Sequence, residues 1–468
     1  MGNYRIVFIR VFDFLPNTII PPLGIASLIT YIKSRTGEFT FDVYDAAISN
    51  EIFSNIERDY KDREPFIFAI SSMLKHYREL KKLVGQLKTK FPSVPIVVGG
   101  PLVSSLKERV LNIKEIDYAI YGEGEIPFYL LCSKMIKEEG LRDIPALIYR
   151  DGVDIETNPP EATTLREDEI PIPDYEEIGL EKYFEYPGFE IIGVRPYLPI
   201  ITSRGCPYSC TYCHGIFGRR VRKIPVDRIV ETVIKFTTKY NIKDIEVLDD
   251  IFNIDEERAK EIITRILNHN RNIQFLYPNG FRTDILSKDF IDFLGSNNTK
   301  YISIAVETAS ERIQRLIKKN LDLNRVRENA IMLSKYDIVL NGYFMIGFPT
   351  ETREEILKTI RYARTLPLHM ASFFRVAPHC GTELFDILPD ETKQEIMDNL
   401  DNVRYYSDAI NISSVPSSTL NMLHKYAVAS FYLDPGRILK IVRDIPAKTV
   451  FTQGMTTFLR ILSGRYKE

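Results

Sequence analysis

Short apolar runs that resemble strands alternate with longer amphipathic stretches along most of the chain, and this alternation constrains the fold more than any other feature. In the first 140 residues, runs such as YRIVFIRV and VPIVVGG are separated by segments such as PLGIASLITYIKSR, whose apolar residues recur at three- and four-residue steps. Strands buried on both faces by crossover helices form a parallel, doubly wound sheet. We therefore predict an α/β fold that begins with a Rossmann-like domain of five strands over residues 1–140.

A second alternation follows after a break in this rhythm. Residues 141–193 contain a hairpin signal at Asp151 and Gly152 and then a stretch rich in proline and acidic residues, which we interpret as a linker. Six strand candidates, from YLPIITS to ASFFRVAP, then alternate with helical stretches. They predict a partial (β/α)6 barrel of the TIM type over residues 194–390, with its chemistry at the carboxyl ends of the strands. Residues 391–468 are predicted to form a mostly helical segment.

Charge and composition narrow the classes of partner. The 468 residues include 61 basic and 63 acidic side chains, so no strong electrostatic field favours nucleic acid or an anionic membrane. The first residues lack the layout of a signal peptide, and no apolar run approaches the ~20 residues of a membrane helix. Five cysteines, three of them clustered, do not match a disulfide framework. We expect a cytoplasmic protein without a transmembrane segment that acts on a small molecule, a lipid or a peptide.

Three of the five cysteines lie in TSRGCPYSCTYCHG, residues 202–215. Cys206, Cys210 and Cys213 have the spacing C-x3-C-x2-C and directly follow the first strand of the predicted barrel. Three thiolates from one loop can hold three irons of a [4Fe–4S] cluster and leave the fourth iron open to a substrate or cofactor. A structural zinc site needs four ligands, and the nearby candidate, His214, adjoins Cys213, which makes joint chelation awkward. The spacing therefore favours the cluster.

Small and polar residues follow the predicted strands of the amino-terminal domain. Ligands of doubly wound sheets bind outside the carboxyl ends of the strands. The residues of interest at these ends are Ser71, Ser72, Gly99, Gly100, Gly122 and Gly124. Glycine permits the backbone to approach a large flat ligand, although the same glycines could serve tight strand-to-helix turns. No G-x-G-x-x-G follows the first strand, which disfavours a nicotinamide cofactor.

The cysteine motif, with the aromatic Tyr212 before its last cysteine, resembles that of the radical SAM superfamily. In that family the open iron binds the amino and carboxylate groups of S-adenosylmethionine (SAM), and one electron cleaves SAM to methionine and a 5′-deoxyadenosyl radical. The resemblance implies a [4Fe–4S] cluster held by the three cysteines, SAM as cofactor, and an electron donor such as flavodoxin or ferredoxin. The radical chemistry belongs to the cofactors, while the protein orients them and excludes water.

Later strand ends resemble the same family. IEVLDDIF is similar to its second-strand motif, SIAVETAS to its fourth strand end, and GYFMIGFPTET to its fifth-strand glycine motif. By this resemblance the SAM-binding residues are Tyr212, Glu246, Asp249, Asp250, Asn279, Arg282, Glu307, Gly347 and Arg375. Glu307 would contact SAM, with structural pairing to an arginine as the alternative. Gly347 would let the adenine lie against backbone, and Arg375 would meet the SAM carboxylate.

The amino-terminal domain narrows the resemblance further. PPLGIASLITYIKS, VVGGPLVSS and YGEGEIPFYLL look like the cobalamin-binding branch of radical SAM enzymes, and the likeness covers about residues 5–445. It implies cobalamin as a third cofactor, held by Pro16, Ser71, Ser72, Gly99, Gly100, Gly122 and Gly124. The D-x-H-x-x-G element that places a histidine below cobalt in other cobalamin proteins is absent. We interpret His76, after the third strand, as a surface histidine at a helix start rather than a substitute ligand.

The leading functional hypothesis is a cobalamin-dependent radical SAM methyltransferase that acts on an unactivated carbon. One SAM would yield the radical that abstracts hydrogen, and a second would remethylate cobalamin. The same cofactors could serve oxidation, cyclisation or ring rearrangement, which the sequence does not separate from methylation. A methylthiotransferase is disfavoured because such relatives carry further cysteines in the amino-terminal domain. A cobalamin or cluster sensor without catalysis is disfavoured by the full set of candidate SAM contacts.

The two remaining cysteines have simpler interpretations. Cys132 lies in the apolar run IPFYLLCSKMI and is predicted to pack within a helix. Cys380, in APHCGTEL, is interpreted as a small residue in a turn rather than as an active-site thiol, because thiols pack readily as small hydrophobes. The sequence leaves the substrate, the lower axial ligand of cobalt and the oligomeric state open.

Overall fold

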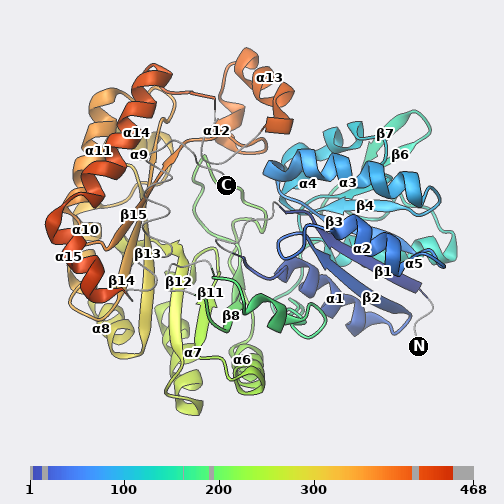
Figure 1. The fold of residues 1–468 in the computed structure, drawn as a ribbon, viewed down its shortest axis with the longest axis horizontal. Helices are drawn as coiled ribbons and strands as arrows, with labels where there is room; N and C mark the ends of the chain where they lie inside the picture. Colours follow the sequence, from blue (N-terminus) through green and yellow to red (C-terminus); the bar gives the residue numbers. More distant parts are fainter. Residues whose placement is uncertain (1–3, 13–18, 162, 189–193, 403–409, 446–468) are drawn as a thin grey trace. The chain divides into compact units, whose positions relative to one another are not determined.

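The structure, a computed structural model, describes residues 4–12, 19–161, 163–188, 194–402 and 410–445. The chain divides into two compact units (Figure 1). The first unit consists of Met1–Tyr183 together with His379–Val403, and the second of Phe184–Pro378 together with Arg404–Glu468. Each unit is built on one large β-sheet.

Among the described residues, the sheet of the first unit has seven strands in the order β2-β1-β3-β4-β5-β6-β7. Their bounds are β1 (Tyr4–Arg10), β2 (Phe39–Asp45), β3 (Ile67–Ser71), β4 (Ile96–Gly99), β5 (Tyr118–Ile120), β6 (Leu147–Asp151) and β7 (Asp154–Thr157). Strands β1 to β5 are parallel, and β6 and β7 extend the sheet in antiparallel fashion. The order 2-1-3-4-5 is that of a doubly wound sheet, which confirms the predicted Rossmann-like domain.

Helices connect these strands because each strand is apolar on both faces. In β1, Ile6 and Phe8 point to one face and Val7 and Ile9 to the other, and all four side chains are buried. A sheet of such strands needs helices on both faces. The connecting elements are α1 (Leu23–Arg35), α2 (Ile52–Asp59), η1 (Leu74–His76), α3 (Tyr77–Lys90), α4 (Pro101–Leu106), η2 (Lys107–Asn112) and α5 (Glu125–Lys137).

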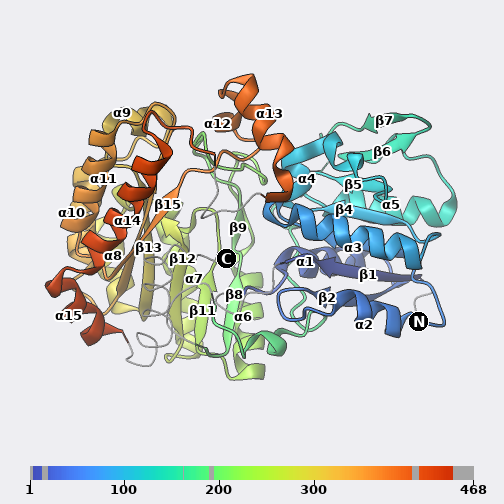
Figure 2. The same cartoon turned by 45° about the horizontal axis from the view of Figure 1, so that its top comes forward.

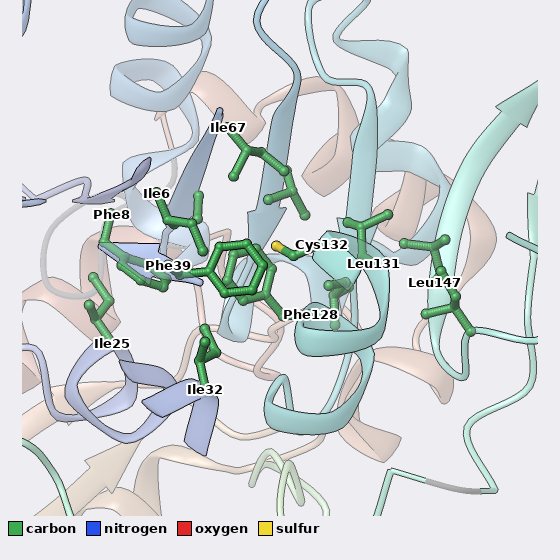
Figure 3. Close-up of a cluster of buried hydrophobic side chains, with 14 of the residues drawn as sticks. Ile6, Phe8, Ile25, Ile32, Phe39, Ile67, Phe128, Leu131, Cys132 and Leu147 are labelled. Carbon is green, nitrogen blue, oxygen red and sulfur yellow. The ribbon is translucent and has the colours of Figure 1, made fainter. Parts of the chain in front are cut away.

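One face of this sheet packs into the core drawn in Figure 3. Phe8 of β1 meets Phe128 of α5, with ring centroids 5.5 Å apart. Each fully buried side chain of this size contributes roughly 1.5–3 kcal/mol to folding. Cys132, also on α5, is fully buried in the same cluster, and burial raises the pKa of its thiol. The prediction that Cys132 packs within a helix is confirmed.

The segment predicted as a linker extends the first unit. Strands β6 and β7 form a hairpin in which Asp151 opposes Asp154 and Gly152 has a φ of +67°, as the Asp-Gly signal predicts. Farther along, η3 (Leu180–Tyr183) ends at Tyr183, whose hydroxyl donates a 2.5 Å hydrogen bond to Asp45 at the end of β2. Residues 141–183 therefore fold with the first unit rather than standing between two units.

A segment from the carboxyl-terminal half of the chain also belongs to the first unit. It contains α12 (Glu383–Asp386), α13 (Asp390–Asp398) and η6 (Leu400–Asn402). Gly381, with a φ of +81°, lies so near α4 that an added Cβ would be 3.2 Å from the Ser104 carbonyl oxygen. Lys81 of α3 pairs with Asp401 at 3.0 Å. The sequence-based boundary at residue 390 therefore does not coincide with a boundary between the units.

Within the ranges given above, the sheet of the second unit has six parallel strands in the order β15-β14-β13-β12-β11-β8 (Figure 2). Their bounds are β8 (Tyr197–Ile200), β11 (Asp244–Val247), β12 (Gln274–Phe281), β13 (Thr299–Glu307), β14 (Val339–Ile346) and β15 (Met370–Arg375). Each strand lies beside its predecessor along the chain. This arrangement confirms the predicted partial (β/α)6 barrel.

Helices connect the strands of the second unit and follow the last of them. These are α6 (Val226–Tyr240), α7 (Glu256–His269), α8 (Lys288–Ser296), α9 (Glu311–Leu316), α10 (Leu323–Leu333), α11 (Arg353–Thr365), α14 (Ser417–Tyr432) and α15 (Pro435–Asp444), with the short turns η4 (Phe252–Ile254) and η5 (Thr283–Ile285). Because the six strands are parallel, their carboxyl ends meet at one edge of the sheet. In the part of the chain that the structure describes, no helix combines the length and the apolar character needed to cross a membrane.

Candidate functional site

The cysteine loop, residues 205–221, is closed at its base by a short antiparallel ladder. Strands β9 (Ser203–Arg204) and β10 (Arg222–Lys223) pair on either side of it. Within the loop, the Cys206 amide donates to the Gly218 carbonyl at 3.2 Å, and the Cys213 amide donates to the Cys210 carbonyl at 3.1 Å. These bonds hold the three cysteines in one compact turn after the first barrel strand.

Two acidic residues after β11 hold the base of this loop. Asp249 accepts hydrogen bonds from the Thr202 amide, the Thr202 hydroxyl and the Ser203 hydroxyl, each at 2.6 Å. Asp250 accepts one from the Gly205 amide at 2.9 Å. Asp249 is 3% exposed, and its three donors offset the cost of burying a carboxylate. Both residues position the chain next to Cys206, and their predicted contact with SAM stays a prediction.

The part of the loop between Cys206 and Cys210 rests on Arg282, another predicted SAM contact. The Arg282 guanidinium carbon lies 3.9 Å from the centroid of the Tyr208 ring, which is within cation–π range. The guanidinium also forms an ion pair with Asp284, with 3.2 Å between Nε and Oδ1. Arg282 therefore supports the loop through the ring that stands between two cysteines.

Glu307 ends β13 with an irregular backbone. The register between β13 and β14 shifts between Ala305 and Glu307, and Glu307 has a φ of +65°. A β-bulge redirects the neighbouring side chain, and a left-handed conformation costs a non-glycine residue roughly 1–2 kcal/mol. The redirected carboxylate accepts a hydrogen bond from the Tyr212 hydroxyl at 3.1 Å and pairs with the Lys319 ammonium at 3.0 Å. Structural pairing of Glu307 is therefore present, with a lysine in place of the arginine considered from the sequence.

Gln314 of α9 ties the turn at Glu307 to the turn at Lys319. Its side-chain nitrogen donates to the carbonyls of Val306 and Thr308, at 3.0 and 2.6 Å, on either side of Glu307. Its backbone carbonyl accepts the Lys319 amide at 3.1 Å. Sequence reasoning missed both Gln314 and Lys319, because a glutamine and a lysine in a helical stretch carry no periodic signal that sets them apart.

The three cysteine side chains are close enough for the charge of one thiolate to affect the pKa of another. Burial raises the pKa of Cys206, and the Cys210 charge adds to the increase. Cys213 is exposed at the loop surface; desolvation by the surrounding loop and the charges of Cys210 and Cys206 raise the pKa of its thiol, and Lys319 opposes the increase. All three cysteines are free. Thiolates that repel one another are stabilised when a positively charged iron–sulfur core binds them, so the loop fits such a cluster.

Within the described ranges, no group of three His, Cys, Asp or Glu side chains is arranged to hold one ion. The choice of a cluster over the zinc site considered from the sequence rests on the spacing of the three cysteines and not on this observation.

Two further predicted SAM contacts lie on the middle strands of the second unit. Glu246 is fully buried within β11. Asn279, near the end of β12, donates its side-chain amide to the Leu248 carbonyl at 2.7 Å. Asn279 thus braces the segment that leads from β11 to Asp249, and a contact of either residue with SAM stays a prediction.

The last two predicted SAM contacts are covered by α14. Gly347 follows β14 with a φ of +95°, and an added Cβ would lie 3.1 Å from the Leu420 side chain. Arg375, at the end of β15, donates a hydrogen bond to the Asn421 side chain at 2.9 Å. In this structure the Arg375 guanidinium therefore donates a hydrogen bond to α14.

A buried carboxyl group supports the turn at Gly347. Glu351 Oε2 accepts the amides of Gly347 and Phe348 at 2.6 and 3.1 Å, and the residue is fully buried. Burial raises the pKa of Glu351 from its usual 4.5 to about 7. The folded protein thus holds this proton more tightly than the unfolded chain, so ionisation of Glu351 costs stability as the pH rises between those two values.

We therefore expect the wild-type protein to lose stability from about pH 5 to about pH 8 relative to the Glu351→Gln variant. Glutamine keeps an oxygen for both amides and removes the ionisation. At 1.36 kcal/mol per pKa unit, the relative loss approaches about 3 kcal/mol above neutral pH. Urea unfolding of both proteins at the two pH values measures it, and an identical pH dependence of the two would contradict the assignment.

Glycines at the strand ends of the first unit form the turns predicted to hold cobalamin. Gly100 has a φ of +87°, and an added Cβ would lie 3.0 Å from the Ser71 hydroxyl oxygen. Gly122 has a φ of +72°, and an added Cβ would meet no atom within 4 Å. Gly100 thus allows a close approach of the turn to the end of β3, as the alternative of a tight strand-to-helix turn predicts, whereas Gly122 presents backbone without a side chain and fits the approach of a large flat ligand such as cobalamin.

The other residues predicted to hold cobalamin have mixed surroundings. Ser72 is 2% exposed, and its hydroxyl donates to the Met73 carbonyl at 3.2 Å. Gly99 ends β4, and Gly124 precedes α5. Pro16 lies outside the described residues. The contacts of all these residues with cobalamin stay predictions.

His76 is buried, and the prediction of a surface histidine was wrong. It ends η1 with no exposed area, and its ring centroid lies 4.8 Å from that of Phe12. Burial lowers the pKa of His76 to about 3, so the imidazole is neutral at physiological pH. The distant segment η6 packs against η1, a contact that sequence order does not reveal.

Cys380 also packs inside the first unit. It is 1% exposed, and its Sγ lies 3.3 Å from Met397 Sδ. The next residue, Gly381, turns with a positive φ. This environment agrees with the interpretation of Cys380 as a small residue in a turn.

Comparisons with known proteins cover both halves of the chain. The family described as the Radical SAM superfamily matches residues 200–363, and the family described as the B12 binding domain matches residues 15–131. An uncharacterized methyltransferase of Pyrococcus horikoshii is 30% identical over 428 residues, which span 90% of this chain and 89% of that protein. The first match contains the cysteine loop, and the second contains the glycine turns after β4 and β5.

Two solved structures share the fold. The radical SAM methyltransferase TsrM from Kitasatospora setae has a TM-score of 0.69 at 15% identity, over 86% of this chain and 78% of that chain. The cobalamin-dependent SAM radical enzyme OxsB has a TM-score of 0.73 at 15% identity, over 98% of this chain and 72% of that chain. With the two family matches, the cofactors are a [4Fe–4S] cluster, SAM and cobalamin. The chain belongs to the cobalamin-binding branch of the radical SAM superfamily of enzymes.

Proposed function

We propose that this enzyme is a methyltransferase that methylates an unactivated carbon of a small-molecule, lipid or peptide substrate. The observation that carries the proposal is the loop of three free cysteines at the barrel edge, in a chain that also matches the B12 binding domain. When bound, the cluster and SAM supply a 5′-deoxyadenosyl radical, and cobalamin supplies the methyl group. A relative that covers most of the chain is named a methyltransferase, which supports this choice over oxidation or rearrangement.

The proposed turnover balances in atoms and charge. A substrate R–H, two SAM cations and two electrons give R–CH3, 5′-deoxyadenosine, methionine and S-adenosylhomocysteine. The electrons come from a donor such as flavodoxin or ferredoxin. A cytoplasmic location accords with free thiols and with access to such donors.

The residues of the chain hold and orient these groups. Cys206, Cys210 and Cys213 bind the cluster, and Asp249 and Asp250 fix the backbone that precedes them. These supports are hydrogen-bonded within the protein itself, so they fix the backbone that leads to the cysteines. The protein thus contributes position, while the bond cleavage belongs to the cofactors.

Product analysis tests the proposal. Protein reconstituted anaerobically with its cluster is incubated with cobalamin, a reductant, SAM labelled with deuterium in its methyl group, and fractions of a cell extract. We expect 5′-deoxyadenosine and S-adenosylhomocysteine to rise together, to require both cobalamin and the extract, and to accompany a product that carries the label. Deoxyadenosine without S-adenosylhomocysteine or labelled product would contradict methyl transfer and favour a radical reaction of another kind.

A further inference from the structure

Strand β12 contains a bulge near its carboxyl end. Its register with β13 shifts between Tyr277 and Phe281, which places residues 278–280 outside the regular pairing. Pro278 has no backbone N–H to donate to a neighbouring strand, and Gly280 has a φ of +92°. Proline and a glycine of positive φ are both typical of a bulge. The sequence YPNGF therefore produces an irregularity at the edge of the sheet where the cysteine loop begins.

Tyr343 of β14 reaches across β13 to this bulge. Strand β13 lies between β12 and β14 (Figure 2). Tyr343 pairs in register with Ala305 of β13, whose small side chain leaves room for the tyrosine ring to pass. The Tyr343 hydroxyl donates a 2.8 Å hydrogen bond to the Pro278 carbonyl, and an added Cβ on Gly280 would lie 3.4 Å from the ring. One side chain thus bonds the bulge through its hydroxyl and places its ring beside it.

Tyr343 is a hydrogen-bond donor at physiological pH. Desolvation raises the pKa of Tyr343 to about 12, although hydrogen bonds with Ser303 and Asn341 oppose the increase. A phenol with this pKa keeps its proton throughout the neutral range, so the hydroxyl donates to the Pro278 carbonyl. Phenylalanine at this position would keep the ring and lose the donor.

Asn279, in the middle of the bulge, ties it to the segment that follows β11. Its side-chain amide donates to the carbonyls of Leu248 and Asp249, at 2.7 and 3.1 Å. The Asp249 carboxylate in turn accepts the amide and the hydroxyl of Thr202, each at 2.6 Å. A series of hydrogen bonds therefore runs from β14, through the bulge of β12 and the end of β11, to the base of the cysteine loop.

We infer that Tyr343 is a positioning residue for the iron–sulfur cluster, and that it acts through the bulge of β12 and Asn279 on the backbone that leads to Cys206. Tyr343 fixes the carbonyl of Pro278, and the next residue carries the amide that fixes the segment at Asp249. Hydrogen bonds that share backbone segments can transmit a displacement, and a coupling measurement is the evidence for it. The inference rests on the proposed function only in that the cluster cleaves SAM, and it does not depend on methyl transfer.

The test removes the Tyr343 hydroxyl and keeps the ring. Tyr343→Phe is reconstituted anaerobically, and three quantities are measured: iron content, the rate of 5′-deoxyadenosine formation per bound cluster, and the electron paramagnetic resonance spectrum of the reduced cluster, which reports the surroundings of the irons. We expect wild-type iron content, an altered spectrum, and a rate lower by about fivefold to tenfold, which corresponds to the loss of one hydrogen bond. A wild-type rate and spectrum in Tyr343→Phe would overturn the inference.

The matched control is Tyr432→Phe, which also removes a tyrosine hydroxyl from the second unit. The Tyr432 hydroxyl donates to the Ala371 carbonyl at 3.1 Å, near the amino end of β15 and thus at the opposite edge of the sheet from the cysteine loop. Its iron content, rate per cluster and spectrum should all match wild type. Equal changes in the two variants would mean a general effect of losing a hydroxyl and would overturn the inference.

A double-mutant cycle tests the route. Asn279→Ala removes the next hydrogen bonds of the series. In that background Tyr343→Phe should lower the rate by less than about twofold further, because residues that act through one another are not additive. The same loss in both backgrounds would show that Tyr343 acts by another route. If Tyr343→Phe takes up less iron than wild type, Asn279→Ala alone supplies the spectral test, and a wild-type spectrum there would contradict the inference.

This experiment fails separately from the proposed function. Iron content, the spectrum of the reduced cluster and SAM cleavage require neither cobalamin nor a methyl acceptor. A protein in which Tyr343→Phe changes the spectrum and the rate as expected, but whose wild type forms no methylated product, would retain this inference and contradict the methyltransferase proposal.

Discussion

Replacement of Cys206, Cys210 or Cys213 by alanine is expected to abolish SAM cleavage and to remove most of the bound iron. In the proposed site each thiolate of the loop binds a different iron of the cluster, so the two other cysteines do not replace the one that is lost. Iron and sulfide analysis of the anaerobically reconstituted variants, with 5′-deoxyadenosine formation as the second readout, measures the effect.

The matched controls are the two cysteines outside the loop. Cys132→Ala and Cys380→Ala also remove a free thiol, but their side chains are buried in the first unit, away from the cysteine loop along the chain. Both should keep their iron and their SAM cleavage. Cobalamin binding, followed by absorbance, should persist in all five variants, because its predicted residues lie in the first unit. A loop variant with full iron content and full SAM cleavage would refute the cluster assignment.

The fold follows from the sequence where strands are apolar on both faces. Runs such as YRIVFIRV place a buried side chain on each face of the sheet, which requires covering helices and hence parallel strands. The same reasoning located the six barrel strands, because each is short, apolar and followed by an amphipathic helix. The local pattern of apolar and polar residues therefore predicted the parallel strands of both sheets.

The local sequence pattern did not predict which distant segments of the chain pack together. Residues 379–403 join the first unit through contacts with α3, α4 and η1, which precede them by hundreds of positions in the chain. The contact of η6 with η1 accompanies the burial of His76. Periodicity reports which face of an element is apolar, but it does not report which distant segment covers that face.

The candidate site likewise contains residues that the sequence identified and contacts that it did not predict. The three cysteines were identified because a short motif with fixed spacing carries its own chemistry. The roles of Asp249 and Arg282 in supporting the loop depend on which strand ends become neighbours, so the sequence predicted both residues as SAM contacts and did not predict this support. Lys319 was missed because its meaning comes from the bulge at Glu307, and a bulge leaves no signature in SIAVETAS.

Gly205→Ala is the single-atom change with the largest expected effect on the site. Gly205 has a φ of +96°, and an added Cβ would lie 2.3 Å from the Arg220 carbonyl oxygen and 3.2 Å from that of Gly218. The first distance is far shorter than a carbon–oxygen contact allows, and the atom it meets is backbone, so the loop base must open. The conformation alone costs a residue with a Cβ of order 1–3 kcal/mol. The Gly218 carbonyl also accepts the Cys206 amide, so the displacement reaches the first cysteine directly.

We expect Gly205→Ala to lower SAM cleavage by about 100-fold, the effect of moving a reacting group by about 1 Å. The control is Gly215→Ala in the same loop, where φ is not positive and the nearest atom to an added Cβ is a flexible Arg219 side-chain atom at 3.6 Å. That variant should keep nearly all of its activity. Iron content, thermal unfolding and 5′-deoxyadenosine formation are measured for both. If Gly205→Ala retains iron and activity equal to Gly215→Ala, the ladder of β9 and β10 adapts to the new atom, and the position of the cluster is set by the cysteines and Arg282 rather than by the base of the loop.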